Sequence, residues 1–154
     1  MVRFFSHPGD SVLSDGSPIT VARWSTYDTS HPQRWTTRKV GQDEHGSDLI
    51  VIEQSDGNGT FRVDVGDNPK AAENHNVLLK KADNSERQKW RVWRDYAGGE
   101  SKLVKLVPYV DATLSVTLQN HTGQWDYVVL SRDISSVDRL WYFNDLAHKE
   151  IIPN

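Results

Sequence analysis

The sequence predicts an all-β fold built from three similar units of four strands each. Three observations carry this prediction. Tryptophans at positions 35, 90 and 141 recur at intervals of 55 and 51 residues, which is typical of an internal structural repeat. Short apolar runs alternate with turn residues, as expected for strands rather than helices. The runs are rich in Val, Ile, Thr, Tyr and Trp, which favour strands.

The second and third units agree with each other without a gap. The apolar run 77–82 begins thirteen residues before Trp90, and the run 128–133 begins thirteen residues before Trp141. Because alternate residues of a strand point to opposite faces, Val77, Leu79, Val128 and Leu130 are expected to face the core. The matching registers predict equivalent positions in the fold.

The first unit departs from this spacing. Its run 21–24 begins fourteen residues before Trp35, which predicts one additional residue in the following loop. This alignment places Trp24 at the position taken by Lys80 and Ser131 in the other units, on the face opposite the core. A shift of the register by one residue would instead turn Trp24 inward, so both orientations stay open.

Each unit resolves into four expected strands. They are 3–5, 11–14, 20–24 and 35–39 in unit one, 49–54, 61–65, 77–81 and 90–94 in unit two, and 103–107, 114–118, 127–131 and 141–143 in unit three. Turn signals such as Asp15-Gly16, Asp56-Gly57 and Asn58-Gly59 separate them. Only the tail after residue 145 and the stretch 84–88 suit a helical turn.

Twelve strands in three sets of four are the strand count of a β-trefoil. A chain of 154 residues suits one domain with a single core. We therefore expect one β-trefoil domain over residues 1–154, with repeats of about 1–47, 48–100 and 101–148.

Composition and motifs argue against several functional classes. The 18 Lys and Arg are outnumbered by 21 Asp and Glu, whereas a nucleic-acid-binding domain is normally basic. The absence of cysteine removes disulfides, thiolate metal sites and thiol nucleophiles. The six histidines show no metal-binding spacing, and no catalytic motif stands out. We expect no enzyme activity, no metal, no cofactor and no nucleic-acid partner.

Targeting signals are also lacking in this sequence. The first residues have no apolar core of a signal peptide, and no apolar run approaches the roughly 20 residues of a membrane span. Together with the lack of cysteine, this predicts a cytoplasmic protein without membrane insertion.

Two of the units carry a Gln-x-Trp motif, Gln33-x-Trp35 and Gln88-x-Trp90, and the third has Arg139 in place of the glutamine. With three registered repeats, the chain resembles the ricin-B-type (R-type) β-trefoil lectins, most of all their fungal cytoplasmic members. The resemblance implies non-catalytic binding of carbohydrate without a metal, often of galactose or N-acetylgalactosamine.

A sugar offers an apolar C–H face and a rim of hydroxyls, so its site needs an exposed aromatic ring and short polar side chains. In the R-type family, an acid after the second strand, an aromatic on the third and polar residues ahead of Gln-x-Trp form the site. Unit one matches this pattern most completely, with Asp10, Asp15, Trp24, Tyr27, His31 and Gln33.

The other two units match less well. Unit two keeps Asp64 and Gln88 as a weaker second site, but Lys80 replaces the aromatic residue. Unit three has Ser115 and Ser131 at the positions of the acid and the aromatic. A single shallow site would bind weakly, so we expect a homodimer to supply avidity.

Structural roles compete with this interpretation. The motif tryptophans fill the core in either case, Gln33 and Gln88 equally suit hydrogen bonds to their own loops, and Asp15 suits capping of its own turn. Two other functions also stay open. One is a β-trefoil proteinase inhibitor that presents loop 42–47 or 66–76, and the other is a protein-interaction module anchored by Trp93 or Trp125.

Overall fold

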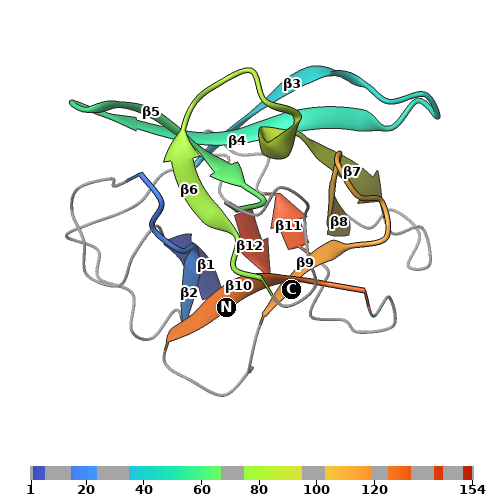
Figure 1. Cartoon of the computed structure of the whole chain (residues 1–154). Coiled ribbons are helices and arrows are strands. Elements are labelled where there is room, and N and C mark those ends of the chain that lie inside the picture. The colour runs from blue at the N-terminus through green and yellow to red at the C-terminus, as the bar shows by residue number, and fades with distance from the viewer. Residues whose placement is uncertain are drawn as a thin grey trace.

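The computed structural model describes residues 2–5, 15–23, 35–66, 75–94, 103–118, 125–132, 141–143 and 151–153. Within these ranges the regular structure is almost all β (Figure 1). Strands β3, β4 and β5 run across the top of Figure 1, above most of the other strands.

The strands follow the three expected units. Unit one holds β1 (Val2–Phe5), β2 (Thr20–Arg23) and β3 (Thr36–Gln42). Unit two holds β4 (Asp48–Asp56), β5 (Gly59–Asp64), β6 (Leu78–Lys81), the 3-10 helix η2 (Glu86–Gln88) and β7 (Trp90–Arg94). Unit three holds β8 (Leu103–Pro108), β9 (Ser115–Leu118), β10 (Trp125–Ser131) and β11 (Trp141–Phe143), and β12 (Ile151–Pro153) follows.

Most of the expected elements are confirmed. The strand expected at 11–14 lies outside the described residues, and the others are found within a few residues of their expected bounds. The helical turn expected within 84–88 is η2. In the tail after residue 145, residues 151–153 form the strand β12, which pairs with β11, and residues 146–150 lie outside the described residues.

All the described strand pairs are antiparallel. The larger sheet has the order β12-β11-β8-β7-β4-β5-β6, with β3 paired to β4, and a second sheet has the order β1-β2-β10-β9. Strand β4 is the centre of the larger sheet because its first residues pair with β7 and its last residues with β5. The β4–β5 hairpin closes over Gly57 and Asn58, where two turn-forming dipeptides predict a turn.

A ring of backbone hydrogen bonds relates the three units. The N–H of Ile19 donates to the carbonyl of Val77 (2.8 Å), that of Val77 donates to Val128 (2.9 Å), and that of Val128 donates to Ile19 (3.0 Å). Each unit therefore gives one residue to the same position around a pseudo-threefold axis. This closed ring couples segments that are more than fifty residues apart in sequence.

The cross-strand pairs around this axis repeat in the same way. They are Pro18 with Leu78, Asn76 with Val129, and Thr20 with Tyr127. The repetition sets the equivalence of the units independently of their amino-acid similarity.

The core lies along this axis and contains the expected residues. Trp35 and Trp90 are 1% and 0% exposed, and Trp90 Nε1 donates to the carbonyl of Val63 (3.0 Å). Burying such a side chain contributes about 2–3 kcal/mol to folding. The expected core positions Val77, Leu79, Val128 and Leu130 are also buried. The side chain of Trp141 lies outside the described residues.

The register of unit one differs from the sequence alignment. Because Ile19 is equivalent to Val77, Val21 is equivalent to Leu79. Trp35 follows Val21 by fourteen residues, whereas Trp90 follows Leu79 by eleven. The loop of unit one is therefore longer by three residues, so the prediction of one additional residue is wrong. Ala22, rather than Trp24, corresponds to Lys80. The alignment failed because runs of similar apolarity fit two registers, and only backbone pairing decides between them.

Candidate functional site

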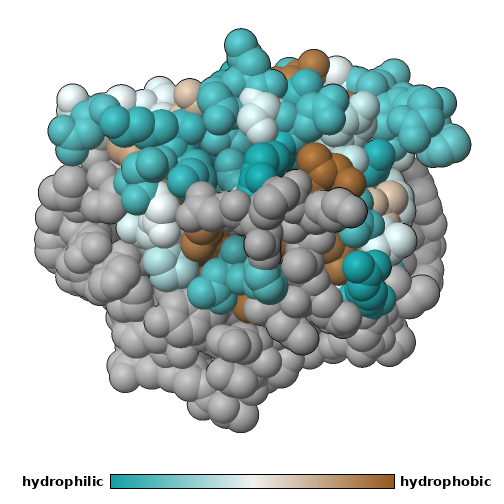
Figure 2. Space-filling model, viewed as in Figure 1, coloured by the Kyte–Doolittle hydropathy of each residue, from teal (hydrophilic) through white to brown (hydrophobic). Residues whose placement is uncertain are grey.

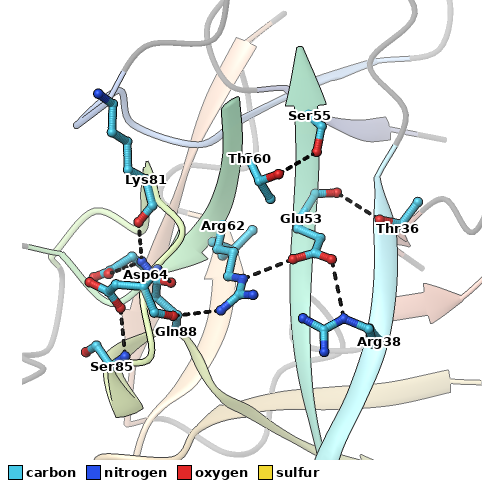
Figure 3. A network of polar contacts seen from close by, with 12 residues as sticks. Thr36, Arg38, Glu53, Ser55, Thr60, Arg62, Asp64, Lys81, Ser85 and Gln88 are labelled. Carbon is cyan, nitrogen blue, oxygen red and sulfur yellow. Dashed lines mark hydrogen bonds and ion pairs between the residues drawn. The ribbon is translucent and has the colours of Figure 1, made fainter. Parts of the chain in front are cut away.

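In unit two, the acid and the glutamine expected at a sugar site lie together. Asp64 is the last residue of β5, and Gln88 is the last residue of η2, two residues before Trp90. Gln88 Nε2 donates to Asp64 Oδ2 over 3.3 Å (Figure 3). Both side chains are buried, Asp64 at 4% and Gln88 at 0% exposure. The contact thus lies beneath the surface.

The amide of Gln88 also holds the chain that follows β6. Its Nε2 donates to the carbonyl of Lys81 (2.9 Å), and its Oε1 accepts from the N–H of Asp83 (3.0 Å). The short helix that carries Gln88 begins at Ser85, whose hydroxyl accepts from the N–H of Arg87 (3.0 Å) as an N-cap. Gln88 therefore fixes segment 81–83, which agrees with the structural role weighed for this residue.

Asp64 is held by donors from its own turn and from η2. Its Oδ1 accepts from the N–H of Gly66 (2.8 Å) and lies 3.7 Å from Arg87 Nε. Burial raises the pKa of the Asp64 carboxyl above its ordinary value, although the hydrogen bonds from Gly66 and Gln88 and the charge of Arg87 act in the opposite direction. Both oxygens of this buried carboxylate thus have partners within the protein.

Asp15 connects unit one to unit two. Its Oδ1 accepts from the N–H of Lys81 (2.6 Å), and its Oδ2 lies 3.8 Å from Lys80 Nζ. Gly16 has a φ of 88° in the same turn, and its N–H donates to the carbonyl of Leu79 (2.7 Å). The carboxylate therefore binds a strand of the next unit. The interpretation of Asp15 as a cap of its own turn missed the N–H of Lys81, which lies 66 residues away in sequence.

The remaining members of the unit-one set, Asp10, Trp24, Tyr27, His31 and Gln33, lie outside the described residues. They stay predictions from the sequence.

In unit three, Ser115 is buried and Ser131 is half-buried. The position equivalent to Gln88 is Arg139, which lies outside the described residues.

A row of charged side chains crosses β3, β4 and β5 beside the contact between Asp64 and Gln88 (Figure 3). Glu53 lies between two arginines, with its Oε2 accepting from Arg62 Nε (3.0 Å) and its Oε1 3.6 Å from Arg38 Nε. Arg62 Nη1 also donates to the carbonyl of Asp83 (2.7 Å). Segment 81–83 is therefore held by Arg62 as well as by Gln88. Sequence reasoning missed this row because it depends on strand register.

A second buried polar contact, also missed, lies at the turn between units one and two. Asp43 Oδ2 accepts from Arg91 Nε (2.8 Å), and Asp43 Oδ1 accepts from the N–H groups of His45 and Ser47. Burial alone would raise the pKa of Asp43, but the Ser47 amide, Arg91 and the His45 amide outweigh it, so the pKa lies below its ordinary value.

Arg91 extends this contact into unit three. Its Nη1 donates to the carbonyls of Pro108 (2.8 Å) and Tyr109 (3.1 Å), and its guanidinium carbon lies 4.9 Å from the centroid of the Tyr109 ring. The turn 43–47, which lies within the loop 42–47 considered for a proteinase inhibitor, is thus compact and held at its base.

The described surface over β3, β4 and β5 is mainly hydrophilic, with small separate hydrophobic groups (Figure 2). Trp93 on β7 is 38% exposed, as the interaction-module hypothesis assumes. Among the described residues, no group of three or more His, Cys, Asp or Glu is arranged to hold a metal ion. Nor does this part of the chain contain a helix long and apolar enough to cross a membrane.

No protein-family model matches the chain, and a search of curated proteins found no similar protein. Among solved structures, it is similar to ThreeFoil, described as a designed 3-fold symmetric protein, with a TM-score of 0.67. The match covers 94% of this chain and 98% of that chain at 15% sequence identity. The fold is a β-trefoil. At this identity the likeness concerns the trefoil fold alone, and the expected fold class is confirmed.

Proposed function

We propose that this trefoil is a non-catalytic, carbohydrate-binding lectin that recognises terminal galactose or N-acetylgalactosamine on glycans, without a metal or cofactor. The observation that supports this most is the contact between Asp64 and Gln88. It joins an acid after the second strand to the glutamine of Gln-x-Trp, the combination that the resemblance to R-type lectins implies. In unit two both groups are buried and bonded within the protein, so short polar groups of the same kinds would bind the hydroxyl rim of a sugar in unit one.

Unit one is the proposed working site. Trp24, two residues after the position equivalent to Lys80, stacks on the apolar face of the sugar, and Asp10, Tyr27, His31 and Gln33 bind its hydroxyls. Asp15 borders this site, with its carboxylate also held by the N–H of Lys81. In unit two, Lys80 stands at the position of the aromatic residue, and Asp64 is buried and bonded to the N–H of Gly66. Unit two is therefore the weaker second site.

The lectin is proposed to act in the cytoplasm as a homodimer, since one shallow site binds weakly and pairing supplies avidity. A Kd of roughly tens of micromolar to a millimolar is expected for a single site. Nucleic acid is not a proposed partner because the net charge is −3.

A titration with lactose, followed by tryptophan fluorescence, tests the proposal. Wild type is expected to give a saturable change that Trp24→Ala loses, because the substitution removes the stacking ring. Trp93→Ala is the matched control, since Trp93 is an exposed tryptophan on β7 and is not part of the proposed site. It should keep the affinity of wild type.

A broad glycan array decides whether the class of ligand is right. Binding to glycans with terminal galactose or N-acetylgalactosamine is expected, and no binding to any glycan would reject the lectin proposal. Stoichiometric inhibition of a serine or cysteine protease would favour the inhibitor instead. Loss of the lactose response in Trp93→Ala, with Trp24→Ala unchanged, would move the site to β7.

A further inference from the structure

Strand β1 takes the position of a second strand, although it comes first in the chain. Phe4 of β1 pairs with Val21 of β2. In unit two, Val63 of β5 pairs with Leu79 of β6. Since Val21 is equivalent to Leu79 around the pseudo-threefold axis, Phe4 is equivalent to Val63. Strands β9 and β10 form the same pair in unit three, so β1 corresponds to β5 and β9 rather than to the first strands β4 and β8.

Strand β12 takes the position of a first strand. In the hairpin from unit two to unit three, Trp90 of β7 pairs with Pro108 of β8. In the same way, Trp141 of β11 pairs with Pro153 of β12. The hairpin of β3 and β4 joins units one and two with the same antiparallel pairing. Strand β12 thus follows the tryptophan-bearing strand of unit three as β8 follows that of unit two.

The sequence around the two prolines agrees with this equivalence. Leu106-Val107-Pro108 ends β8, and Ile151-Ile152-Pro153 forms β12. Both segments place two aliphatic residues directly before a proline, and Val and Ile favour strands. The equivalence of β8 and β12 is therefore visible in both the pairing and the residue types.

Strand β12 also lies beside the second strand that it would need as a partner. It contacts β1, just as β4 contacts β5 and β8 contacts β9 (Figure 1). When β12 is counted in unit one, each unit holds four strands among the described residues: β12, β1, β2 and β3 in unit one, β4 to β7 in unit two, and β8 to β11 in unit three.

Strand β12 is the least firmly held of the three first strands. It has three residues, compared with six in β8 and nine in β4. Among the described residues β12 pairs with β11 alone, whereas β4 pairs with β3, β5 and β7. A segment held by few backbone hydrogen bonds opens at a smaller free energy than the whole fold.

We propose that β12 is the first strand of unit one and acts as a strap, which closes the trefoil between β11 and β1 and opens while units two and three stay folded. Unit one is then assembled from segments at opposite ends of the described chain. An open strap leaves the edges of β1 and β11 without their partner, and such edges are sites for pairing with another strand. The inference is independent of the proposed lectin function.

The equivalence with unit two predicts the register between β12 and β1, which a disulfide can test. Glu53 pairs with Arg62 in the β4–β5 ladder, so Ile152 is expected across from Arg3. The chain has no cysteine, and opposed residues of an antiparallel pair lie within the span of a disulfide. The Arg3→Cys, Ile152→Cys double variant is expected to form an intramolecular disulfide on oxidation, detected by mass spectrometry of its peptides.

The matched control places the second cysteine at the equivalent position of unit two. Arg62→Cys, Ile152→Cys should form no intramolecular disulfide, because Arg62 lies in β5 rather than in β1. In wild type, a nuclear Overhauser effect between backbone protons of Arg3 and Ile152 is expected, which tests the register without any substitution. Absence of both this effect and the Arg3–Ile152 disulfide, or a disulfide in the control, would refute the placement of β12.

Hydrogen exchange followed by mass spectrometry tests the opening of the strap. In wild type, the amides of β12 are expected to exchange at least about tenfold faster than those of the equivalent strand β8. The disulfide between positions 3 and 152 should slow exchange in β12 about tenfold and leave β8 unchanged. Equal exchange of β12 and β8 in wild type, or no slowing by the disulfide, would show that β12 opens only with the whole fold and would overturn its role as a strap.

Discussion

Two buried aspartates, Asp43 and Asp64, sit in similar turns but in opposite electrostatic situations. Each accepts a hydrogen bond from a backbone N–H two residues ahead, from His45 in one case and Gly66 in the other. The pKa of Asp43 is lowered and that of Asp64 is raised. The same local turn therefore does not decide the charge state.

The difference lies in the second backbone donor and in the cation, since the Ser47 amide lowers the pKa of Asp43 most and Arg91 lowers it next. Arg91 Nε is 2.8 Å from Asp43 and forms a hydrogen bond, whereas Arg87 Nε is 3.7 Å from Asp64. Asp43 also gains a second backbone donor, Ser47, while the second donor to Asp64 is the neutral amide of Gln88. A buried carboxylate with a hydrogen-bonded cation stays charged more easily than one that relies on amides.

Arg91→Met is expected to have the largest effect, because it removes the cation from Asp43 and the donor from the carbonyls of Pro108 and Tyr109. Breaking a buried pair on one side is strongly destabilising, and we expect Tm to fall by about 10 °C. Thermal unfolding followed by circular dichroism measures this. In the Arg91→Met, Asp43→Asn double variant part of the loss should return; an additive loss would contradict the pairing.

Gly66→Ala and Gly46→Ala compare the two turns directly, with a smaller effect. Both glycines have positive φ, 103° and 81°. A Cβ at Gly66 would lie 3.1 Å from the carbonyl oxygen of Asn76, whereas a Cβ at Gly46 meets no atom within 4 Å. We expect Gly66→Ala to cost about 2 kcal/mol and Gly46→Ala about 1 kcal/mol in chemical denaturation. Equal losses would mean that the Asp64 turn adjusts freely.

The smallest expected effect is the difference between wild type and Asp64→Asn in how the free energy of unfolding changes with pH. Since the pKa of Asp64 is raised on folding, its contribution is fully present below its ordinary pKa of 3.8 and is lost as pH rises through the folded value. Relative to Asp64→Asn, wild type should therefore become less stable as pH increases across this window. Denaturant unfolding at a series of pH values measures the difference.

The contribution of Asp43 to stability is expected to change with pH in the opposite direction. Its lowered pKa gives stability that is present above its ordinary pKa of 3.8 and lost as pH falls through the folded value. The stability of wild type relative to Asp43→Asn should thus decrease toward acid. If the stability of wild type relative to each of the two variants changed with pH in the same direction, the two turns would not differ electrostatically as described.

The expected elements and the site residues were predictable to different degrees. The strand runs and the core positions Val77 and Leu79 follow from alternating apolarity, which is a local property of the chain. The partner of Asp43 was not predictable, because Arg91 lies 48 residues away and nothing in the local sequence of either residue identifies the other. The sequence predicted Asp64 and Gln88 as members of one site, but it did not predict that both side chains are buried.

Unit one shows most clearly what the apolar pattern of the sequence cannot predict. Apolar similarity aligned 21–24 with the third strand of unit two, but the backbone ring through Ile19 requires a register two residues away. Both registers keep the same residues on the same face, since strand alternation has a period of two. Hydrophobic pattern therefore could not distinguish them, and hydrogen bonds between strands could.

The spacing of three tryptophans and the alternation of apolar residues by themselves determined that this chain forms a trefoil of strands around a shared core, because burial of apolar surface follows local periodicity. Only the tertiary structure decided which buried polar groups find partners. Asp43 meets a cation, Asp64 meets an amide, and the Nε2 donor of Gln54 meets no acceptor among the described residues. Such contacts depend on register between distant strands, and a hydrogen bond tolerates only a few tenths of an ångström of misplacement.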